Sequence, residues 1–215
     1  RDPNGNWIHE SDGRVALDKY KRLYGYSDPD FTFGFINTFM LGNWSMTVGI
    51  DGRIGGLMDN YIYGKMYDTG SAPETDTKWR YDEVVNGGKY IGEGVKVVSG
   101  KVTYDTQGNI TEDTRTYAKN DIPVSYQRYM RQYGNSWENR IHNATFIKLR
   151  ELSIEYRLPQ TFVHKIGMRS ASIAITGSNL LMWTKDFKYS DPDVGKEDMN
   201  APSQRMLGVN VKIGF

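Results

Sequence analysis

Five segments of the chain alternate between apolar and polar residues with a period of two. This period is typical of β-strands whose two faces meet different surroundings. The clearest case is the final stretch, "RMLGVNVKIGF", in which Leu207, Val209, Val211, Ile213 and Phe215 fall on one parity. The alternation predicts strands over residues 31–41, 44–54, 145–158, 171–183 and 205–215.

Two local features refine these strands. Gly42-Asn43 between the first two segments suits a two-residue hairpin turn, because glycine tolerates the positive φ required there. In the third segment Ile147 and Leu149 carry one parity, whereas Leu152 carries the other. This change indicates a β-bulge or a membrane exit near Arg150.

The connections between the strands are unequal in length. Two are short, Gly42-Asn43 and residues 159–169, while residues 55–144 and 184–204 form long connections at the opposite end of the strands. Within the longest connection, the sequence predicts a small β-hairpin around Gln107-Gly108-Asn109 and a short helix after Pro123. Short turns at one end and long loops at the other are typical of transmembrane barrels. A soluble β-sandwich also alternates, so the pattern alone leaves both architectures open.

Composition narrows the functional classes. A formal net charge of +1 argues against nucleic acid as a partner. The chain has no cysteine, and no apolar run approaches the roughly 18–20 residues of a membrane-spanning helix. The chain is therefore either soluble or enters a membrane as strands.

Several stretches together resemble one family. They are "SDPDFTFGF", "GVKVVSGKVTYDTQGNITEDTRTYAKNDIPVSYQRY", "ATFIKLRELSIEYRLP", "GSNLLMWTK", "YSDPDVG" and "GVNVKIGF". In this order they resemble the carboxyl-terminal part of SusC/RagA-type TonB-dependent outer-membrane transporters. The resemblance implies an all-β fold, a transmembrane antiparallel β-barrel of 22 strands with a plug in its lumen. It also implies import of glycan or peptide fragments across the bacterial outer membrane, driven by TonB and assisted by a SusD-like surface lipoprotein.

The resemblance assigns each segment to a side of the membrane. Residues 1–30 would be an extracellular loop, 31–54 a transmembrane hairpin, 55–144 a large extracellular loop, and 145–215 three transmembrane strands. The connection 159–169 would then be a periplasmic turn, and 184–204 an extracellular loop. The plug and the TonB-contacting segment would lie upstream, and the last strand would pair with the first strand of the barrel. The resemblance further implies that Val209, Val211, Ile213 and Phe215 form the signal read by the barrel-assembly machinery.

Enzyme signatures are absent from the sequence. It has no Cys-His pair and no G-x-S-x-G motif. Glu151 and Glu155 share a strand face, but four residues along a strand is about 13 Å, whereas glycosidase carboxylates lie roughly 5–9.5 Å apart. We expect no enzyme, and we predict that polar-face charges line the lumen or simply form a solvated surface. These residues are Asp51, Arg53, Glu151, Glu155, Arg157 and Lys212.

Two further groups are candidate binding residues. Aromatic side chains of the large loop could stack on sugars, or could pack the loop or contact the lid protein. They are Trp79, Tyr81, Tyr90, Tyr126, Tyr129, Tyr133 and Trp137. Asp2, Asn4 and Asn6 have the alternate spacing that begins a calcium loop, although Trp7 and Gly13 depart from that motif, and an Asx-rich turn is the alternative. No other cofactor is expected.

Three functions remain in competition. The resemblance favours an energised importer in the outer membrane, in contact with lipid and with the rest of its barrel and plug. A passive porin-like barrel and a soluble all-β glycan-binding or adhesin module are the alternatives. Only the first two require that the apolar strand face touches lipid.

Overall fold

The computed structural model describes residues 1–194 and 201–215. The chain forms two compact units. Unit 1 consists of Arg1–Gly25 and Asp59–Ile141, and unit 2 of Tyr26–Met58 and His142–Phe215. Part of the predicted loop 184–204, namely residues 195–200, lies outside the described residues.

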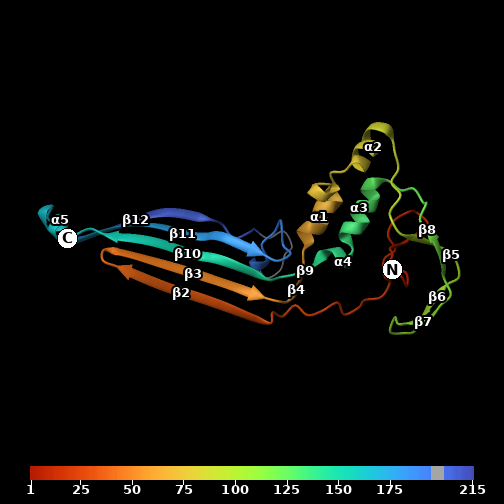
Figure 1. Ribbon diagram of the computed structural model, residues 1–215, viewed down its shortest axis with the longest axis horizontal. Helices are drawn as coiled ribbons and strands as arrows, with labels where there is room; N and C mark the ends of the chain where they lie inside the picture. The colour runs from red at the N-terminus through yellow and green to blue at the C-terminus, as the bar shows by residue number, and fades with distance from the viewer. Residues whose placement is uncertain (195–200) are drawn as a thin grey trace. The chain divides into compact units, whose positions relative to one another are not determined.

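Unit 2 is built on one antiparallel sheet of five strands, which lie side by side in Figure 1. Their order is β12-β11-β10-β3-β2. The strands are β2 (Phe31–Leu41), β3 (Trp44–Ile54), β10 (Phe146–Arg157), β11 (Ser170–Thr184) and β12 (Met206–Gly214). Each of the five strands predicted from the alternation is confirmed, and no end differs by more than one residue.

The predicted turn and bulge are both present. Gly42 has φ +56 and begins the two-residue connection between β2 and β3, so a glycine occupies the first central position as a type II′ turn requires. The register of β10 shifts between Leu149 and Glu151 against both of its neighbours. On the β11 side the irregularity includes Asn179, which has φ +51. The bulge explanation of the parity change is therefore confirmed.

The ends of the sheet carry the remaining elements of unit 2. The short connection after β10 contains helix α5 (Gln160–Lys165), which the sequence did not predict and which buries Val163. A 3₁₀ turn, η2 (Pro192–Val194), lies between β11 and β12. Near the other end of the strands, Met58, Ala144 and Phe187 form a small buried cluster. Within the described part of unit 2, no second sheet lies against either face of the five strands.

Unit 1 mixes short strands and helices. A three-stranded sheet has the order β1-β5-β8, and β6 pairs with β7 in a hairpin. These strands are β1 (Ile8–His9), β5 (Val95–Ser99), β6 (Val102–Tyr104), β7 (Ile110–Asp113) and β8 (Thr116–Lys119). The helices are α1 (Tyr61–Thr69), α2 (Lys78–Asn86), α3 (Tyr126–Asn135) and α4 (Trp137–Arg140), with a 3₁₀ turn η1 (Pro73–Thr75). β4 (Leu57–Asp59) and β9 (Ile141–Asn143) pair where the chain passes between the units.

The predicted hairpin and the helix after Pro123 are present in unit 1 as β6–β7 and α3, but α1, α2 and α4 were not predicted. Residues 1–25 also form no separate loop, because β1 pairs in parallel with β5 and Val15 is buried with Val124 and Tyr129. β-structure predominates in unit 2 and helices in much of unit 1. No helix among residues 1–194 and 201–215 combines the length and apolar character needed to cross a membrane.

Candidate functional site

One face of the five-stranded sheet is almost entirely apolar. The strand registers place the apolar parities of all five strands on this face, with Asn37 as the polar exception. Its members include Phe31, Phe33, Phe35, Phe39, Trp44, Met46, Ile50, Leu152, Ile154, Ile173, Ile175, Leu207, Val209, Val211 and Ile213. We call this set the apolar face. Many of these side chains are exposed, and Leu207 reaches 75%.

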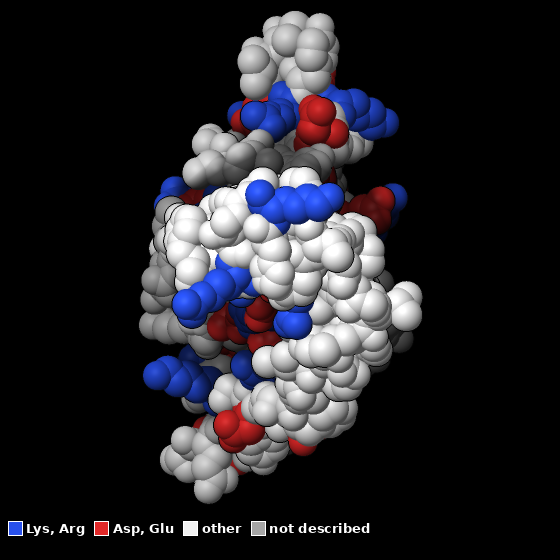
Figure 2. Space-filling view, turned by 90° about the vertical axis from the view of Figure 1, so that its left-hand side faces the viewer, with Lys and Arg blue, Asp and Glu red and all other residues white. Residues whose placement is uncertain are grey.

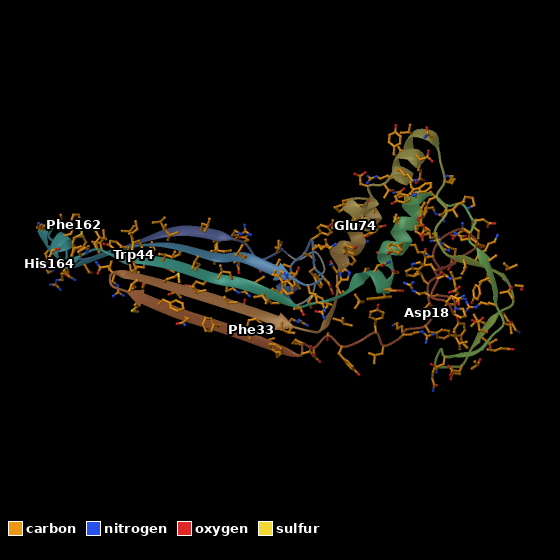
Figure 3. The ribbon with its side chains drawn as sticks, viewed as in Figure 1. Asp18, Phe33, Trp44, Glu74, Phe162 and His164 are labelled. Carbon is orange, nitrogen blue, oxygen red and sulfur yellow. The ribbon has the colours of Figure 1, made fainter. Side chains whose placement is uncertain are left out.

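The residues predicted to form the assembly signal lie at one edge of the apolar face, and aromatic residues lie near both ends of the β2–β3 hairpin. Val209, Val211 and Ile213 lie on it in β12 and are exposed, as is the terminal Phe215. Trp44 packs on Tyr156 next to the hairpin turn, with ring centroids 4.7 Å apart, and Figure 3 shows Phe33 towards the other end of the hairpin. Figure 2 shows a broad surface without charged side chains beside a group of acidic and basic ones. Exposed apolar side chains gathered on one face mark a surface that contacts a partner, a ligand or a membrane.

The opposite face of the sheet carries the polar parities, and we call it the polar face. Asp51, Arg53, Glu151, Glu155, Arg157 and Lys212 share it by register, as the sequence predicted. Glu155 pairs with Lys212 at 3.5 Å and with Arg157 at 3.8 Å, and Arg53 donates a hydrogen bond to the carbonyl of Ser27. Glu151 lies opposite Gly49 and is exposed. Whether this face lines a lumen stays a prediction.

A buried ion-pair network crosses the bulge on the polar face. Lys148 is only 2% exposed, and its Nζ donates to Asp191 at 2.7 Å, Ser203 at 2.8 Å and Asp193 at 2.9 Å. Arg150, at the bulge, donates to Asp51 at 3.0 Å and to Asn179 at 3.1 Å. The network joins the described parts of the β11–β12 connection to the sheet.

Arg150 also links the two halves of this network, because its Nη1 lies 2.9 Å from Asp193. The carboxylates of the connection are held in the charged state. Burial opposes ionisation of Asp191, but hydrogen bonds from Lys148 and Ser203 lower its pKa to about 2. The pKa of Asp193 is also lowered, because the hydrogen bonds from Arg150 and Lys148 outweigh its burial.

Sequence reasoning missed Lys148, Asp191 and Asp193 as a unit. A signal for the two aspartates was available, because the pentapeptide Tyr-Ser-Asp-Pro-Asp occurs twice, at residues 26–30 and 189–193. The first copy immediately precedes β2, and the second supplies both carboxylate partners of Lys148. The repeat could have drawn attention to Asp191 and Asp193, but nothing in the sequence pairs them with Lys148.

The aromatic candidates of unit 1 do not form one surface. Tyr126 and Tyr129 are buried, and Tyr129 (5% exposed) packs with Val15 and Val124. Tyr90 meets Tyr126 and Tyr129 edge-on, with ring centroids 5.3 and 4.8 Å apart. Burial raises the pKa of Tyr129, as expected for a phenol in a core. For these three residues the packing alternative accounts for the contacts.

Three candidate aromatics remain accessible. Trp79 and Tyr81 on α2 are exposed, and Trp137 on α4 is 64% exposed. Trp79 still touches Tyr90 edge-on at 5.6 Å, whereas Tyr133 stacks on Tyr129 inside the cluster. Direct contact of Trp79, Tyr81 or Trp137 with a substrate stays a prediction.

The stretch Asp2–Asn6 folds as an Asx turn. The Asp2 carboxylate accepts hydrogen bonds from the backbone N of Asn4 at 3.0 Å and of Asn6 at 2.7 Å, and from Asn6 Nδ2 at 3.0 Å. The side-chain hydrogen bond from Asn6 is the main reason that the pKa of Asp2 is lowered. The same pattern joins Asp105 to Asn109 in the β6–β7 turn.

These two turns share the sequence pattern Asp-x-x-Gly-Asn, at residues 2–6 and 105–109. Their common hydrogen bonds explain the spacing of Asp2 and Asn6 without a cation. Among residues 1–194 and 201–215, no group of three or more His, Asp or Glu side chains is arranged to hold a metal ion. The hydrogen bonds of the Asx turn are thus present in this stretch, and calcium binding by Asp2, Asn4 and Asn6 stays a prediction.

The chain is similar to several known proteins. No family model matches the chain. TonB-dependent receptor P3 of Formosa agariphila is 24% identical over 97% of the chain, which spans 17% of that receptor's length. The structure of the RagAB peptide transporter matches 87% of the chain with a TM-score of 0.53 and 18% identity. The RagAB peptide importer in its closed-closed state matches 97% of the chain with a TM-score of 0.57, also at 18% identity.

These comparisons confirm the resemblance to SusC/RagA-type TonB-dependent transporters in sequence and in fold. The matched proteins are described as receptors and transporters, not as enzymes. The chain covers 17% and 21% of the two matched structures, so it corresponds to about a fifth or less of each. Activity, substrate and partners of the whole protein are therefore proposals.

Proposed function

We propose that this chain is the carboxyl-terminal barrel portion of a TonB-dependent importer in the bacterial outer membrane. In this proposal the apolar face contacts lipid, and the polar face lines the lumen of a closed, plugged barrel of 22 strands. β2 and β12 pair with strands outside this sequence, since unpaired backbone groups cost several kcal/mol each in hydrocarbon. The transported molecules are glycan or peptide fragments, and a SusD-like surface lipoprotein assists their capture.

The apolar face is the observation that carries this proposal. In a soluble sandwich these side chains would pack against a second sheet about 10 Å away. Unit 2 offers no such layer among its described residues, and Leu207, Ile175 and Val209 remain exposed. A sheet that is apolar on one side and charged on the other fits the alternation of transmembrane barrels.

A pair of adjacent substitutions in β12 of the full-length protein tests this assignment. Val209→Arg places a charge on the apolar face, where a cation near the bilayer centre costs about 2–4 kcal/mol. Asn210→Arg places the same charge on the polar face of the same strand. We expect Val209→Arg to reduce the amount of protein in the outer-membrane fraction severalfold and Asn210→Arg to leave it near the wild-type amount. Equal amounts for the two variants would exclude lipid contact by this face.

Energy dependence separates an importer from a passive barrel. We expect uptake by the full-length protein in cells to stop when TonB is deleted, because the plug must be moved. A porin-like barrel would continue to admit substrate. Uptake of labelled peptides and of labelled oligosaccharides in the same cells distinguishes the two substrate classes.

Co-purification tests the proposed lipoprotein partner. The fold of this chain is similar to that of the RagAB peptide transporter, and this similarity supports a search for a lipoprotein partner. Full-length protein extracted from native membranes in mild detergent should bring with it a lipid-anchored surface protein in a stoichiometric amount. A transporter that purifies alone under conditions that preserve its uptake activity would contradict this part of the proposal.

A further inference from the structure

A cavity of about 390 Å³ lies beside the end of β11. β12 pairs with β11 only as far as Met206 and Ser178, whereas β11 continues to Thr184. The described parts of the β11–β12 connection, together with Lys148 of β10, complete the walls of this cavity. Its volume falls in the range of small-ligand sites.

The buried part of the cavity lining is held in place by ion pairs. Lys148 and Asp191 both line the cavity and are 2% and 4% exposed. Lys148 Nζ donates to Asp191 at 2.7 Å and to Ser203, a third lining residue, at 2.8 Å. Since Lys148 also reaches Asp193, two carboxylates already neutralise it. Lys148 and Asp191 therefore shape the cavity, but the charge of Lys148 is not available to bind a ligand.

Two other cations contribute positive charge to the lining. Lys188 and Arg205 line the same cavity and are exposed. Neither forms an ion pair with a carboxylate in residues 1–194 or 201–215, and Asp191 is already occupied. A guanidinium matches a carboxylate, because it is planar and can donate two parallel hydrogen bonds to the two oxygens, and an ammonium is a further donor.

The position of the cavity at the edge of β11 bears on the source of its ligand. Lys148 and Met182 are register partners on the polar face, and both line the cavity. A ligand moving along that face meets the cavity. Leu181 also lines the cavity and belongs to the apolar parity by register, so a lipid headgroup is the competing ligand that the test below separates. Tyr189 and Pro202 add apolar surface to the lining, which suits an organic acid better than a bare inorganic anion.

We propose that this cavity binds a carboxylate group of the transported molecule between Lys188 and Arg205. Two substrate types carry this group, a peptide with a free carboxyl terminus and an oligosaccharide that contains a uronic acid. That the ligand is a transported molecule rests on the function proposed above. That the ligand carries a carboxylate rests on the cavity alone. Neutral oligosaccharides do not use this site.

The test measures binding to the full-length protein in detergent by calorimetry at low salt. One pair of probes is N-acetylated tetra-alanine with a free carboxyl terminus and its terminal amide, and the other is tri-galacturonate and its methyl ester. We expect the free acid of at least one pair to bind at least tenfold more tightly than its neutral form. The pair that shows the difference identifies the source of the carboxylate.

Matched variants locate the effect. Lys188→Gln with Arg205→Gln should remove the discrimination between acid and neutral form, whereas Lys185→Gln, in the same connection but outside the cavity lining, should preserve it. The free acids should also bind more weakly as salt is added, because the contact is ionic.

Three results would overturn the proposal: no binding of either free acid at millimolar concentration, equal binding of acid and neutral forms, or unchanged discrimination in the double variant. A double variant that loses only a co-purified phosphate-bearing lipid would instead assign the two cations to a headgroup and would also overturn it. None of these results bears on membrane insertion or TonB dependence, so the proposed function is tested separately.

Discussion

The side chain of Lys148 shows how a single charge organises the polar face. It is buried, and its three partners Asp191, Asp193 and Ser203 lie 43 to 55 positions further along the chain. A buried ammonium is tolerated only when it is paired and hydrogen-bonded. The ion pairs of Lys148 thus hold the described parts of the β11–β12 connection against the sheet and complete the floor of the adjacent cavity.

Lys148→Met tests this role. Loss of the ammonium leaves Asp191 buried without its main partner, and breaking such a pair costs about 3–5 kcal/mol. We expect a lower midpoint of thermal unfolding for the full-length protein in detergent, followed by the heat-dependent shift of the folded band on gels. Lys185→Met, at an exposed position after β11, should leave the midpoint unchanged. If Lys148→Met matched Lys185→Met, the network would contribute nothing to stability.

The carboxylate of Asp191 predicts a dependence on pH. Its pKa of about 2 in the folded protein lies below the usual aspartate value of about 4. Its ionised form therefore stabilises the fold fully above pH 4, and this contribution is lost as the pH falls through 2. We expect Asp191→Asn to lower the unfolding midpoint at pH 6 and to have progressively less effect between pH 4 and pH 2.

The control for this pH dependence is Asp28→Asn, the equivalent position in the first Tyr-Ser-Asp-Pro-Asp copy. Asp28 is exposed and forms no ion pair among the described residues. Its substitution should shift the midpoint little at any pH. A constant difference between Asp191→Asn and wild type from pH 6 to pH 2 would be incompatible with the assigned titration.

At the scale of elements, the turn of the β2–β3 hairpin depends directly on one residue, Gly42. Gly34 and Gly42 both have open space where a Cβ would be placed, but only Gly42 has a positive φ. We expect Gly42→Ala to lower stability by about 1 kcal/mol or more, because an L-residue is strained there. Gly34→Ala, within the strand, should be neutral or slightly stabilising. The two unfolding midpoints, measured side by side, check this, and equal effects would show that the turn geometry is not limiting.

The strands could be predicted from the sequence because their two faces, one apolar and one polar, meet different surroundings, and this difference produces the alternation. A parity change at Arg150 even located the bulge. Helix α1 was missed because "YIYGKMYDT" is rich in aromatic and β-branched residues with a central glycine, which suggests no helix. Its ends did carry helix signals, since Asn60 Oδ1 accepts from Tyr63 N at 3.1 Å and Gly70 follows the last residue.

Contacts between distant segments were beyond sequence reasoning. The pairing of Ile8 with Val95, and of Lys148 with Asp191, depends on where long connections turn, and periodicity carries no such information. Packing of the α3 tyrosines, in contrast, was one of the alternatives that the sequence offered. Tyr126, Tyr129 and Tyr133 recur at helical spacing, and in α3 that spacing directs them into the interior of unit 1.

At the scale of the whole molecule, we expect the five-stranded sheet on its own to be unstable in water. β2 and β12 each leave one edge without a strand partner in the described residues, and the apolar face is uncovered. Exposed apolar edge strands pair with other chains.

We therefore expect residues 1–215, produced alone, to aggregate in buffer and to need detergent for dispersion, as measured by light scattering and sedimentation with and without detergent. Unit 1 alone, with Arg1–Gly25 joined to Asp59–Ile141 by a flexible linker, lacks the five-stranded sheet with its edges and apolar face, and should require detergent far less. A monomeric, detergent-free 215-residue chain with a cooperative unfolding transition would mean that the apolar face finds its cover within this sequence, and the membrane assignment would fail with it.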